Sequence, residues 1–312
     1  MSPTTTIRVG TRRSLLARTQ SELVAAALRT ALGREVELVE VTTEGDLSAA
    51  PLATMGGTGV FVTALRDALL RGDVDLAVHS LKDLPTTPHE RIALAAVPLR
   101  EDPRDVVVAR DGLTLGELPA GARIGTGSPR RSAQLRALGL GFDVVAIRGN
   151  VDTRIKKVFA GELDAVVLAR AGLARLGRMD VVTEVLDPLQ MLPAPGQGAL
   201  AVECRVDDAE LAARVREAID DPRSRAAVAA ERAVLAGLEA GCSAPVGAMA
   251  EIAEGDDGDE LWLRAVALAP DGAVAVRRSA TGLPENAEKV GRGLAEEMLD
   301  DGASRLIEEQ TA

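Results

Sequence analysis

Histidine, cysteine and lysine are all scarce in this chain of 312 residues. It contains two histidines and two cysteines, and only four of its 36 basic residues are lysines. The cysteines, Cys204 and Cys242, form neither a metal-binding spacing nor a disulfide framework. We therefore expect a cytoplasmic protein, held in a reducing compartment, with no metal site.

Long apolar runs are absent as well. No run approaches the roughly 20 residues that a membrane-spanning helix needs. Residues 1–6 are polar and lack the apolar core of a secretory signal. The glycines match neither a P-loop nor a dinucleotide-binding fingerprint. With 46% hydrophobic and 27% charged residues, the composition is instead that of an ordinary globular protein without membrane contact.

The net charge of −11 argues against a dedicated nucleic-acid-binding protein, because such proteins usually carry a basic surface. The charge is nevertheless uneven along the chain. Residues 123–157 hold eight basic side chains against two acidic ones, whereas acidic residues predominate from Glu251 onward. A basic patch on an acidic protein suggests an anionic ligand in a focused site.

The hydrophobic pattern alternates between strands and helices, which predicts an α/β fold with right-handed crossovers. Two stretches of this pattern are similar. The segment RVGT at 8–11 recurs as RIGT at 123–126, and GDVDLAV at 72–78 resembles GELDAVV at 161–167. The repetition predicts two similar α/β domains. We expect strands at 7–11, 36–41, 76–79, 144–147 and 199–204, and helices at 14–32, 61–71 and 209–219.

The remaining segment predicts a small α+β domain. We expect a helix at 225–238, strands at 246–252, 261–269 and 273–280, and one final helix from 286 toward 308. The predicted boundaries are residues 1–99 with 199–219 for domain 1, 104–194 for domain 2, and 222–312 for domain 3.

Each Gly-Thr turn feeds the start of a helix, where free backbone N–H groups and the helix dipole favour anions. Arg12 and Ser14 stand at the first start, and Ser128, Arg130 and Arg131 at the second. Arginine can hold a carboxylate with two parallel hydrogen bonds and keeps its charge. A single turn of this kind would be an ordinary helix cap with solvated arginines, but two matching turns favour anion binding.

The segment 78–85 (VHSLKDLP) follows an apolar strand at the end where open α/β sheets bind their ligands. Lys82 beside Asp83 could be a surface ion pair of little energetic value. The adjacent Ser80 and the strand-end position favour an acid–base role for this turn. We expect His79, inside the strand, to be a hydrogen-bonded structural residue.

The segment 148–154 (RGNVDTR) places Arg148 at another strand end and Arg154 on the helix that follows. Together with the earlier arginines, they suggest a substrate with several carboxylates. Cys242 lies on a glycine loop and is a candidate nucleophile, although no histidine is near it in sequence. Cys204, in a strand, is better explained as a buried hydrophobic residue.

Taken together, these motifs resemble the porphobilinogen deaminase (hydroxymethylbilane synthase) family over nearly the whole chain. The resemblance rests on 78–85 (VHSLKDLP), 101–105 (EDPRD), 124–131 (IGTGSPRR), 148–154 (RGNVDTR), 195–199 (PGQGA) and 241–245 (GCSAP). It implies two domains like the halves of a type II periplasmic binding protein, placed around a cleft, plus the small third domain.

The resemblance also implies a transferase that deaminates porphobilinogen, couples four units head to tail and releases hydroxymethylbilane for uroporphyrinogen-III synthase. The dipyrromethane cofactor would be joined by a thioether to Cys242. Asp83 matches the catalytic aspartate, which would stabilise the cation left when ammonia departs. Cofactor carboxylates would balance the arginines, so an apo form should be less stable. The implied carboxylate-binding residues are Arg12, Ser14, Ser80, Lys82, Thr126, Ser128, Arg130, Arg131, Arg148, Arg154 and Arg175.

One departure concerns the long loop at 44–59, which we expect to be a lid. Many family members carry lysines there, whereas this chain has Thr54 and Thr58. The lid would then depend more on Phe61 and on the backbone amides of Gly57 and Gly59.

Two other classes of function fit parts of the pattern. A solute-binding protein would use the same arginine-lined cleft but release its ligand unchanged. A cysteine-dependent hydrolase would need a general base near Cys242. For the family member that the resemblance implies, we expect a monomer.

Overall fold

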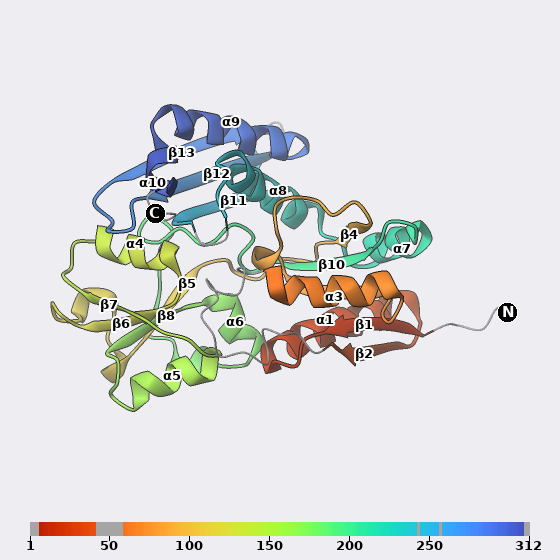
Figure 1. Ribbon diagram of the computed structural model, residues 1–312, viewed down its shortest axis with the longest axis horizontal. Coiled ribbons are helices and arrows are strands. Elements are labelled where there is room, and N and C mark those ends of the chain that lie inside the picture. Colours follow the sequence, from red (N-terminus) through yellow and green to blue (C-terminus); the bar gives the residue numbers. More distant parts are fainter. Residues whose placement is uncertain (1–5, 42–58, 242–243, 256–257, 309–312) are drawn as a thin grey trace. The chain divides into compact units, whose positions relative to one another are not determined.

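The computed structural model describes residues 6–41, 59–241, 244–255 and 258–308. The chain divides into two compact units, which are Met1–Glu101 with Ala199–Arg225, and Asp102–Gly198 with Ala226–Ala312. Figure 1 shows the elements of each unit. The division of the chain into three domains stays a prediction.

The first unit contains a five-stranded sheet with the order β2-β1-β3-β10-β4. Strands β1, β2 and β3 are parallel, and β10 runs antiparallel to both of its neighbours. Its fourth strand in space therefore comes from far along the chain. The strands are β1 (Ile7–Thr11), β2 (Val36–Glu40), β3 (Leu76–Ser80), β4 (Ile92–Ala96) and β10 (Leu200–Arg205).

The second unit repeats this arrangement in a sheet with the order β7-β6-β8-β5-β9. Here β6 is parallel to β7 and β8, and β5 is the antiparallel strand between β8 and β9. The two halves of the predicted repeat thus occupy equivalent strands, and the α/β fold class is confirmed. The strands are β5 (Asp105–Ala109), β6 (Arg123–Thr126), β7 (Asp143–Ala146), β8 (Ala165–Ala169) and β9 (Glu184–Val185).

Helices cover both faces of each sheet, which explains why the central strands β3, β5, β8 and β10 are largely buried and mostly apolar. In the first sheet, α1 and α7 share one hydrophobic cluster with the strands, and α3 shares another. In the second, α4 contributes Leu135 to one cluster, while α5 and α6 contribute Ile155 and Leu173 to the other. The helices are α1 (Leu15–Leu32), α3 (Gly59–Arg71), α4 (Pro129–Ala137), α5 (Val151–Phe159), α6 (Arg170–Arg175) and α7 (Ala209–Ile219).

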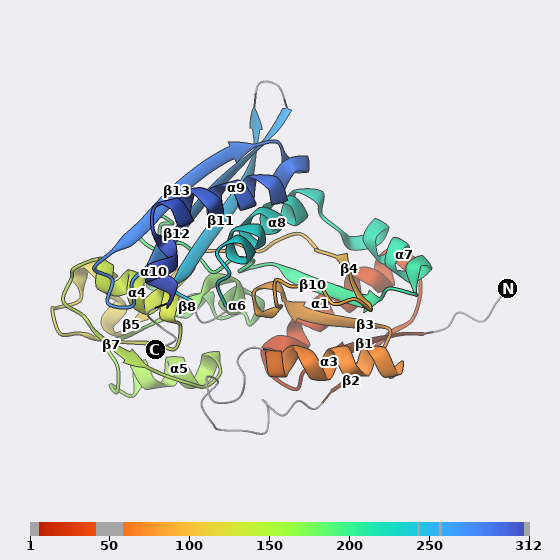
Figure 2. The ribbon, with the colours of Figure 1, turned by 45° about the horizontal axis from the view of Figure 1, so that its top comes forward.

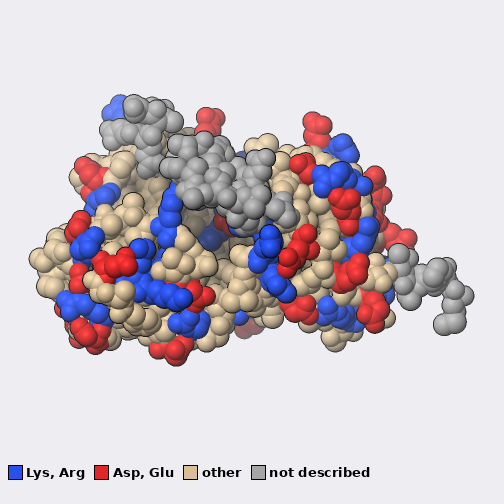
Figure 3. Space-filling view, turned by 60° about the horizontal axis from the view of Figure 1, so that its bottom comes forward, with Lys and Arg blue, Asp and Glu red and all other residues tan. Residues whose placement is uncertain are grey.

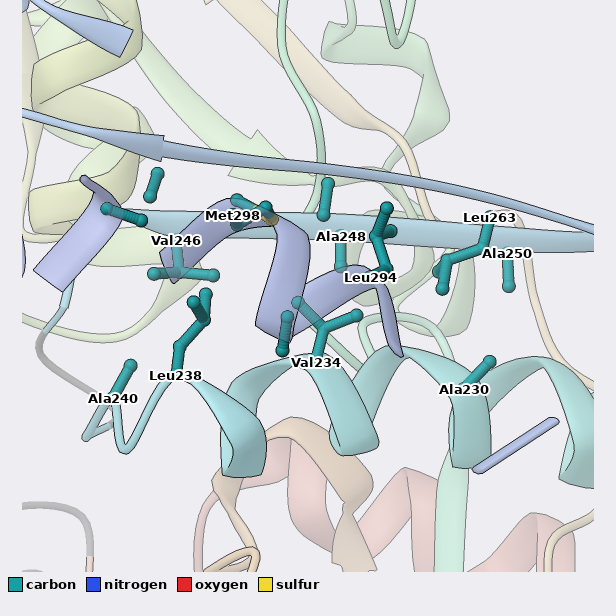
Figure 4. Close-up of a cluster of buried hydrophobic side chains, with 14 of the residues drawn as sticks. Ala230, Val234, Leu238, Ala240, Val246, Ala248, Ala250, Leu263, Leu294 and Met298 are labelled. Carbon is teal, nitrogen blue, oxygen red and sulfur yellow. The ribbon is translucent and has the colours of Figure 1, made fainter. Parts of the chain in front are cut away.

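A separate three-stranded antiparallel sheet, β11-β12-β13, forms the C-terminal part of the second unit. One face packs against α8, α9 and α10 through a core rich in alanine and leucine (Figures 2 and 4). Figure 4 shows Val234 of α8, and Leu238 just after the end of α8, pointing into the core that also contains Leu294 and Met298 of α9. The elements are α8 (Pro222–Gly237), β11 (Val246–Gly255), β12 (Gly258–Leu268), β13 (Ala275–Gly282), α9 (Ala287–Asp300) and α10 (Ala303–Glu308).

The single helix expected from 286 toward 308 is wrong, because the chain forms two helices there. Gly302 lies between α9 and α10 with a φ of 88°, which ends a right-handed helix. None of the helices in the described ranges combines the length and apolar character that crossing a membrane requires.

Close packing of α9 on α8 gives a test of the C-terminal core. A Cβ added to Gly291 would lie 2.7 Å from the Cβ of Ala233 and would also meet the carbonyl oxygen of Ala230. We expect Gly291→Ala to lower the free energy of unfolding by about 1–3 kcal/mol, because this contact cannot relax without moving a helix. Urea unfolding monitored by circular dichroism would measure the change.

Gly293 is the matched control, since it lies on the same helix and a Cβ there meets nothing within 4 Å. Gly293→Ala should raise the free energy of unfolding by about 0.5–1 kcal/mol through its helix propensity alone. Equal effects at the two positions would contradict this packing of α8 and α9.

Candidate functional site

In the first unit, the predicted site residues gather at one edge of the sheet. Strands β1 and β3 are parallel neighbours, so their carboxyl ends lie side by side. Arg12 and Ser14 follow β1, where the Ser14 hydroxyl accepts a hydrogen bond from the backbone N–H of Ala17 at 3.3 Å and caps α1. Lys82 and Asp83 follow β3 in a short 3-10 turn, Leu81–Asp83. The fold therefore brings the segment 78–85 and the first Gly-Thr turn together.

A buried glutamine supports this turn from α1. The side-chain amide of Gln20 donates to the Ser80 hydroxyl at 3.1 Å, and the Ser80 hydroxyl lies 3.3 Å from the Gln20 carbonyl oxygen. Gln20 itself is buried. Gln20 was not predicted from the sequence, because a single polar residue within a helical pattern is typical of a solvated helix face. Its contact with Ser80 becomes visible only when α1 is packed against β3.

His79 is buried behind the turn beside a carboxylate, and its hydrogen-bonded structural role stays a prediction, because its Nε2 has no hydrogen-bond partner among the described residues. Its Nε2 lies 3.3 Å from an oxygen of Glu203 on β10, and Arg66 of α3 contacts the same carboxylate at 2.6 and 3.0 Å. Burial alone would raise the pKa of Glu203, but the adjacent His79 and the hydrogen bonds from Arg66 outweigh it and lower the pKa to about 2. The Glu203 carboxylate thus stays ionised. It links Arg66 of α3 to β10, and it lies beside His79 of β3, the strand that ends at Ser80.

In the second unit, the predicted residues gather at the equivalent edge of the second sheet. Thr126 ends β6, where its hydroxyl accepts from the backbone N–H of Ser128 at 3.2 Å, and Ser128 caps α4. Arg148 follows β7 and is exposed. Because β6, β7 and β8 are parallel, their carboxyl ends meet at one edge, where the helix starts of α4 and α5 also lie.

Two further arginines at this edge contact backbone carbonyls. Arg154 donates its Nε–H to the carbonyl oxygen of Gly149 at 2.8 Å, and Arg175 donates to that of Gly198 at 2.6 Å. Burial, with a smaller contribution from the positive charge of Arg131, lowers the pKa of Arg154. Both side chains are therefore held in place by the protein itself.

Arg130 and Arg131 differ from the other arginines because they are buried, with 3% and 6% of their surface exposed. Their common partner is Asp105, the first residue of β5, which is completely buried. Arg130 contacts one oxygen of Asp105 at 2.8 Å, and Arg131 donates to the other at 2.7 and 3.2 Å. Gln197 also donates to that second oxygen, at 2.8 Å.

Asp105 and Gln197 were not predicted as site residues, although each lies in a motif that carries the resemblance, 101–105 (EDPRD) and 195–199 (PGQGA). Asp105 is 26 residues from Arg131 and 92 residues from Gln197, so only the tertiary fold unites them. Whether Arg130 and Arg131 bind a ligand stays a prediction, since the described structure shows them bound to Asp105.

Several predictions fall where the structure gives no information. Cys242 and Thr58 lie outside the described residues, and for Gly59 and Phe61 the structure describes the helical backbone alone. The two sheet edges belong to different units, so the cleft between them also stays a prediction. Cys204, by contrast, is completely buried in β10, and burial raises its thiol pKa to about 11. This environment fits the expected hydrophobic role of Cys204.

The donor set of the second edge fits a ligand with several carboxylates. Arginines follow three neighbouring strands, and serine, threonine and asparagine side chains cap the adjoining turns. The buried Nε of Arg130 has no hydrogen-bond partner among the described residues. Within these residues, no group of His, Cys, Asp and Glu side chains could hold a metal ion. Figure 3 shows basic and acidic side chains interspersed over the visible surface.

Family models and similar proteins of known family match this chain over nearly its whole length. A family model for the porphobilinogen deaminase dipyromethane cofactor binding domain matches residues 7–213, and one for the porphobilinogen deaminase C-terminal domain matches residues 225–300. The chain is 59% identical to the porphobilinogen deaminase of Nocardia farcinica, over 99% of this chain and 90% of that protein. It is 58% identical to the enzyme of Mycobacterium tuberculosis, over 96% and 98%.

Solved structures similar to this chain include the methionine-binding protein MetQ, with a TM-score of 0.44, 14% identity, and coverage of 68% of this chain and 89% of that one. The periplasmic VFT2 domain of BvgS from Bordetella pertussis has a TM-score of 0.42 and 18% identity, and the match covers 68% and 86%.

Proposed function

This chain belongs to the porphobilinogen deaminase family, and from that premise we propose how its own residues bind and transform the substrate. The family assignment gives a transferase that deaminates porphobilinogen and contains a dipyrromethane-binding domain. We propose that the arginine edge of the second sheet holds substrate and cofactor carboxylates, while the Lys82–Asp83 turn of the first sheet performs the acid–base step. The observation that carries this proposal is that the two sheets have equivalent strand orders and present polar residues at the same edge. In the second sheet this edge carries arginines, and in the first sheet it carries the Asp83 carboxylate.

The cationic residues bind acetate and propionate groups by charge and geometry. Arg148 follows β7, while Arg154 lies on α5 and Arg175 on α6. Each of these arginines can donate paired hydrogen bonds to a carboxylate. Thr126 and Ser128 lie at the start of α4, where the helix dipole favours negative charge. Arg12 and Ser14 occupy the equivalent start of α1 in the first unit. A lengthening pyrrole chain adds carboxylates, and fixed cations at several strand ends suit that requirement.

Asp83 acts on the substrate itself. Its carboxylate accepts hydrogen bonds from pyrrole N–H groups and stabilises the positive charge that develops as ammonia leaves. Lys82 and Ser80 bind substrate carboxylates beside it. The 3-10 turn and the contact between Ser80 and Gln20 hold these three side chains at the strand end. Asp83 then takes the proton that the attacking pyrrole carbon loses.

The cofactor is proposed to be joined to Cys242 through a thioether. When bound, dipyrromethane supplies the pyrrole carbon on which four substrate units are coupled before hydroxymethylbilane is released by hydrolysis. Cys242 follows Leu238 and Ala240, which are buried in the C-terminal core and anchor the chain just before it. The segment that contains Thr58, Gly59 and Phe61 is proposed to close over the growing chain.

Three further properties are proposed with the function. The enzyme works as a monomer in the cytoplasm, binds neither nucleic acid nor membrane, and passes its product to uroporphyrinogen-III synthase. The net charge of −11 supports the absence of nucleic-acid binding.

The proposed function predicts a fixed stoichiometry. Purified protein incubated with porphobilinogen should release four molecules of ammonia for each hydroxymethylbilane, because four units are deaminated per product. Ammonia would be measured with a coupled dehydrogenase assay, and hydroxymethylbilane by its cyclisation and oxidation to uroporphyrin I. Binding of porphobilinogen without ammonia release would favour a solute-binding protein instead.

A further inference from the structure

The buried cluster around Asp105 contains more positive than negative charge. Arg130 and Arg131 both contact Asp105, and the remaining donor, Gln197, is neutral. Neither guanidinium can lose its proton under ordinary conditions. Among the described residues, two cations against one anion leave an excess of one positive charge in a buried place, where unbalanced charge is costly.

The surroundings add to this positive potential. Arg130 and Arg131 are the second and third residues of α4, so they lie at the positive end of its dipole. Arg154 is near enough for the charge of Arg131 to lower its pKa. Burial likewise lowers the pKa of Arg130, and the attraction of Asp105 opposes that effect. Asp105 therefore reduces the electrostatic cost of burying Arg130 and Arg131 together.

Asp105 itself remains ionised and fixed in orientation. Burial favours its neutral form, but Arg130, Arg131 and Gln197 outweigh that effect and hold its pKa far below the usual range. Gln197 donates to Asp105 and to the carbonyl oxygen of Pro103, at 2.8 and 2.7 Å. Arg131 also donates to the carbonyl oxygen of Val167 at 3.1 Å. Each guanidinium is thus positioned before any ligand binds.

We propose that Asp105 is a resident counter-ion, which stabilises the Arg130–Arg131 pair before cofactor carboxylates bind and leaves the pair with one positive charge to offer them. Asp105 is completely buried, so it is a positioning residue that acts through the two arginines. This inference rests on the proposed function, in which those arginines hold ligand carboxylates. It follows that the unloaded protein depends on Asp105 more than the loaded protein does.

The test compares thermal unfolding in two backgrounds. The loaded background is the wild-type protein, and the unloaded one is Cys242→Ser, with the loading of each established by intact mass. Asp105→Asn keeps the shape of the side chain and removes its charge, so the unloaded cluster gains a second uncompensated cation. We expect Asp105→Asn to lower Tm in both backgrounds, and by roughly 5 °C or more further in the unloaded one. Equal losses would overturn the proposal.

Asp75→Asn is the matched control. Asp75 of the first unit forms a partly buried pair with Arg8 at 2.7 Å, and it takes no part in the proposed carboxylate site. Its substitution should lower Tm equally in the two backgrounds. A background-dependent loss of the same size at Asp75 would also overturn the proposal, because it would show that loading changes the whole protein's tolerance of substitution.

A second variant covers the case in which unloaded Asp105→Asn does not fold. Adding Arg131→Gln returns the cluster to a single excess positive charge, so the unloaded protein should become soluble and folded again. Failure of this charge-restored variant to fold would contradict the charge account. If the wild-type protein carries no adduct even after incubation with porphobilinogen or hydroxymethylbilane, the proposed function fails and this inference fails with it. If the wild-type protein carries the adduct but Asp105→Asn lowers Tm equally in the two backgrounds, the proposed function stands and only the role of Asp105 is contradicted.

Discussion

Asp83→Asn is expected to lower the rate of hydroxymethylbilane formation by roughly 10²–10⁴-fold, the range typical of a lost acid–base group. Asparagine has nearly the same shape, so the 3-10 turn Leu81–Asp83 and the contact between Ser80 and Gln20 should persist. The variant cannot accept a proton or balance the charge that develops as ammonia leaves. Single-turnover release of ammonia from porphobilinogen would measure this step directly.

The effect should be confined to the chemical step. Porphobilinogen binding, measured by equilibrium dialysis, should change little, because the carboxylate-binding cations remain. Asp67→Asn is the control, since Asp67 is an exposed carboxylate on α3 outside the proposed site. It should retain full activity. Wild-type turnover in Asp83→Asn would remove Asp83 from the mechanism.

Glu203→Leu is expected to lower the free energy of unfolding by about 3–5 kcal/mol, because it leaves Arg66, a largely shielded cation, without its anion. Arg66 and His79 both contact the Glu203 carboxylate, and both are largely shielded from water. By comparison, Glu22→Gln removes an exposed pair with Arg29 and should cost at most about 1 kcal/mol. Urea unfolding at neutral pH would measure both.

The same network predicts a pH dependence. The pKa of Glu203 is about 2 in the folded protein against an ordinary value of 4.5. A carboxyl group whose pKa is lowered by folding contributes stability above the unfolded pKa, and this contribution is lost as pH falls toward the folded pKa. We therefore expect wild-type stability to fall between pH 4.5 and 2, and Glu203→Leu to show a shallower fall over that range. Parallel pH profiles for the two proteins would contradict the assignment.

Much of the fold follows from local sequence. The repeated Gly-Thr turns and the similar segments at 72–78 and 161–167 predicted two related sheets, and the strand orders confirm them. Helix α7 was predicted with its observed ends. The break at Gly302 was missed, because glycine inside an otherwise helical pattern is often tolerated.

The candidate site was less predictable, for a physical reason. Residues at strand ends and helix starts, such as Ser14 and Ser128, have local signals because capping is a local interaction. Asp105, Gln197 and Glu203 act through partners on distant segments. Nothing in the local pattern distinguishes such a buried charge from a solvated one, so the sequence identified the arginines but not the carboxylate that balances two of them.

The intact mass of the denatured protein tests the central claim most directly. Denaturation removes any ligand that is not covalently bound. Wild-type protein should exceed its sequence mass by two linked pyrrole units, and Cys242→Ser should have the sequence mass alone. An adduct that persists in Cys242→Ser would contradict the attachment site. Unmodified wild-type protein that stays unmodified after incubation with porphobilinogen or hydroxymethylbilane would contradict the proposed enzyme.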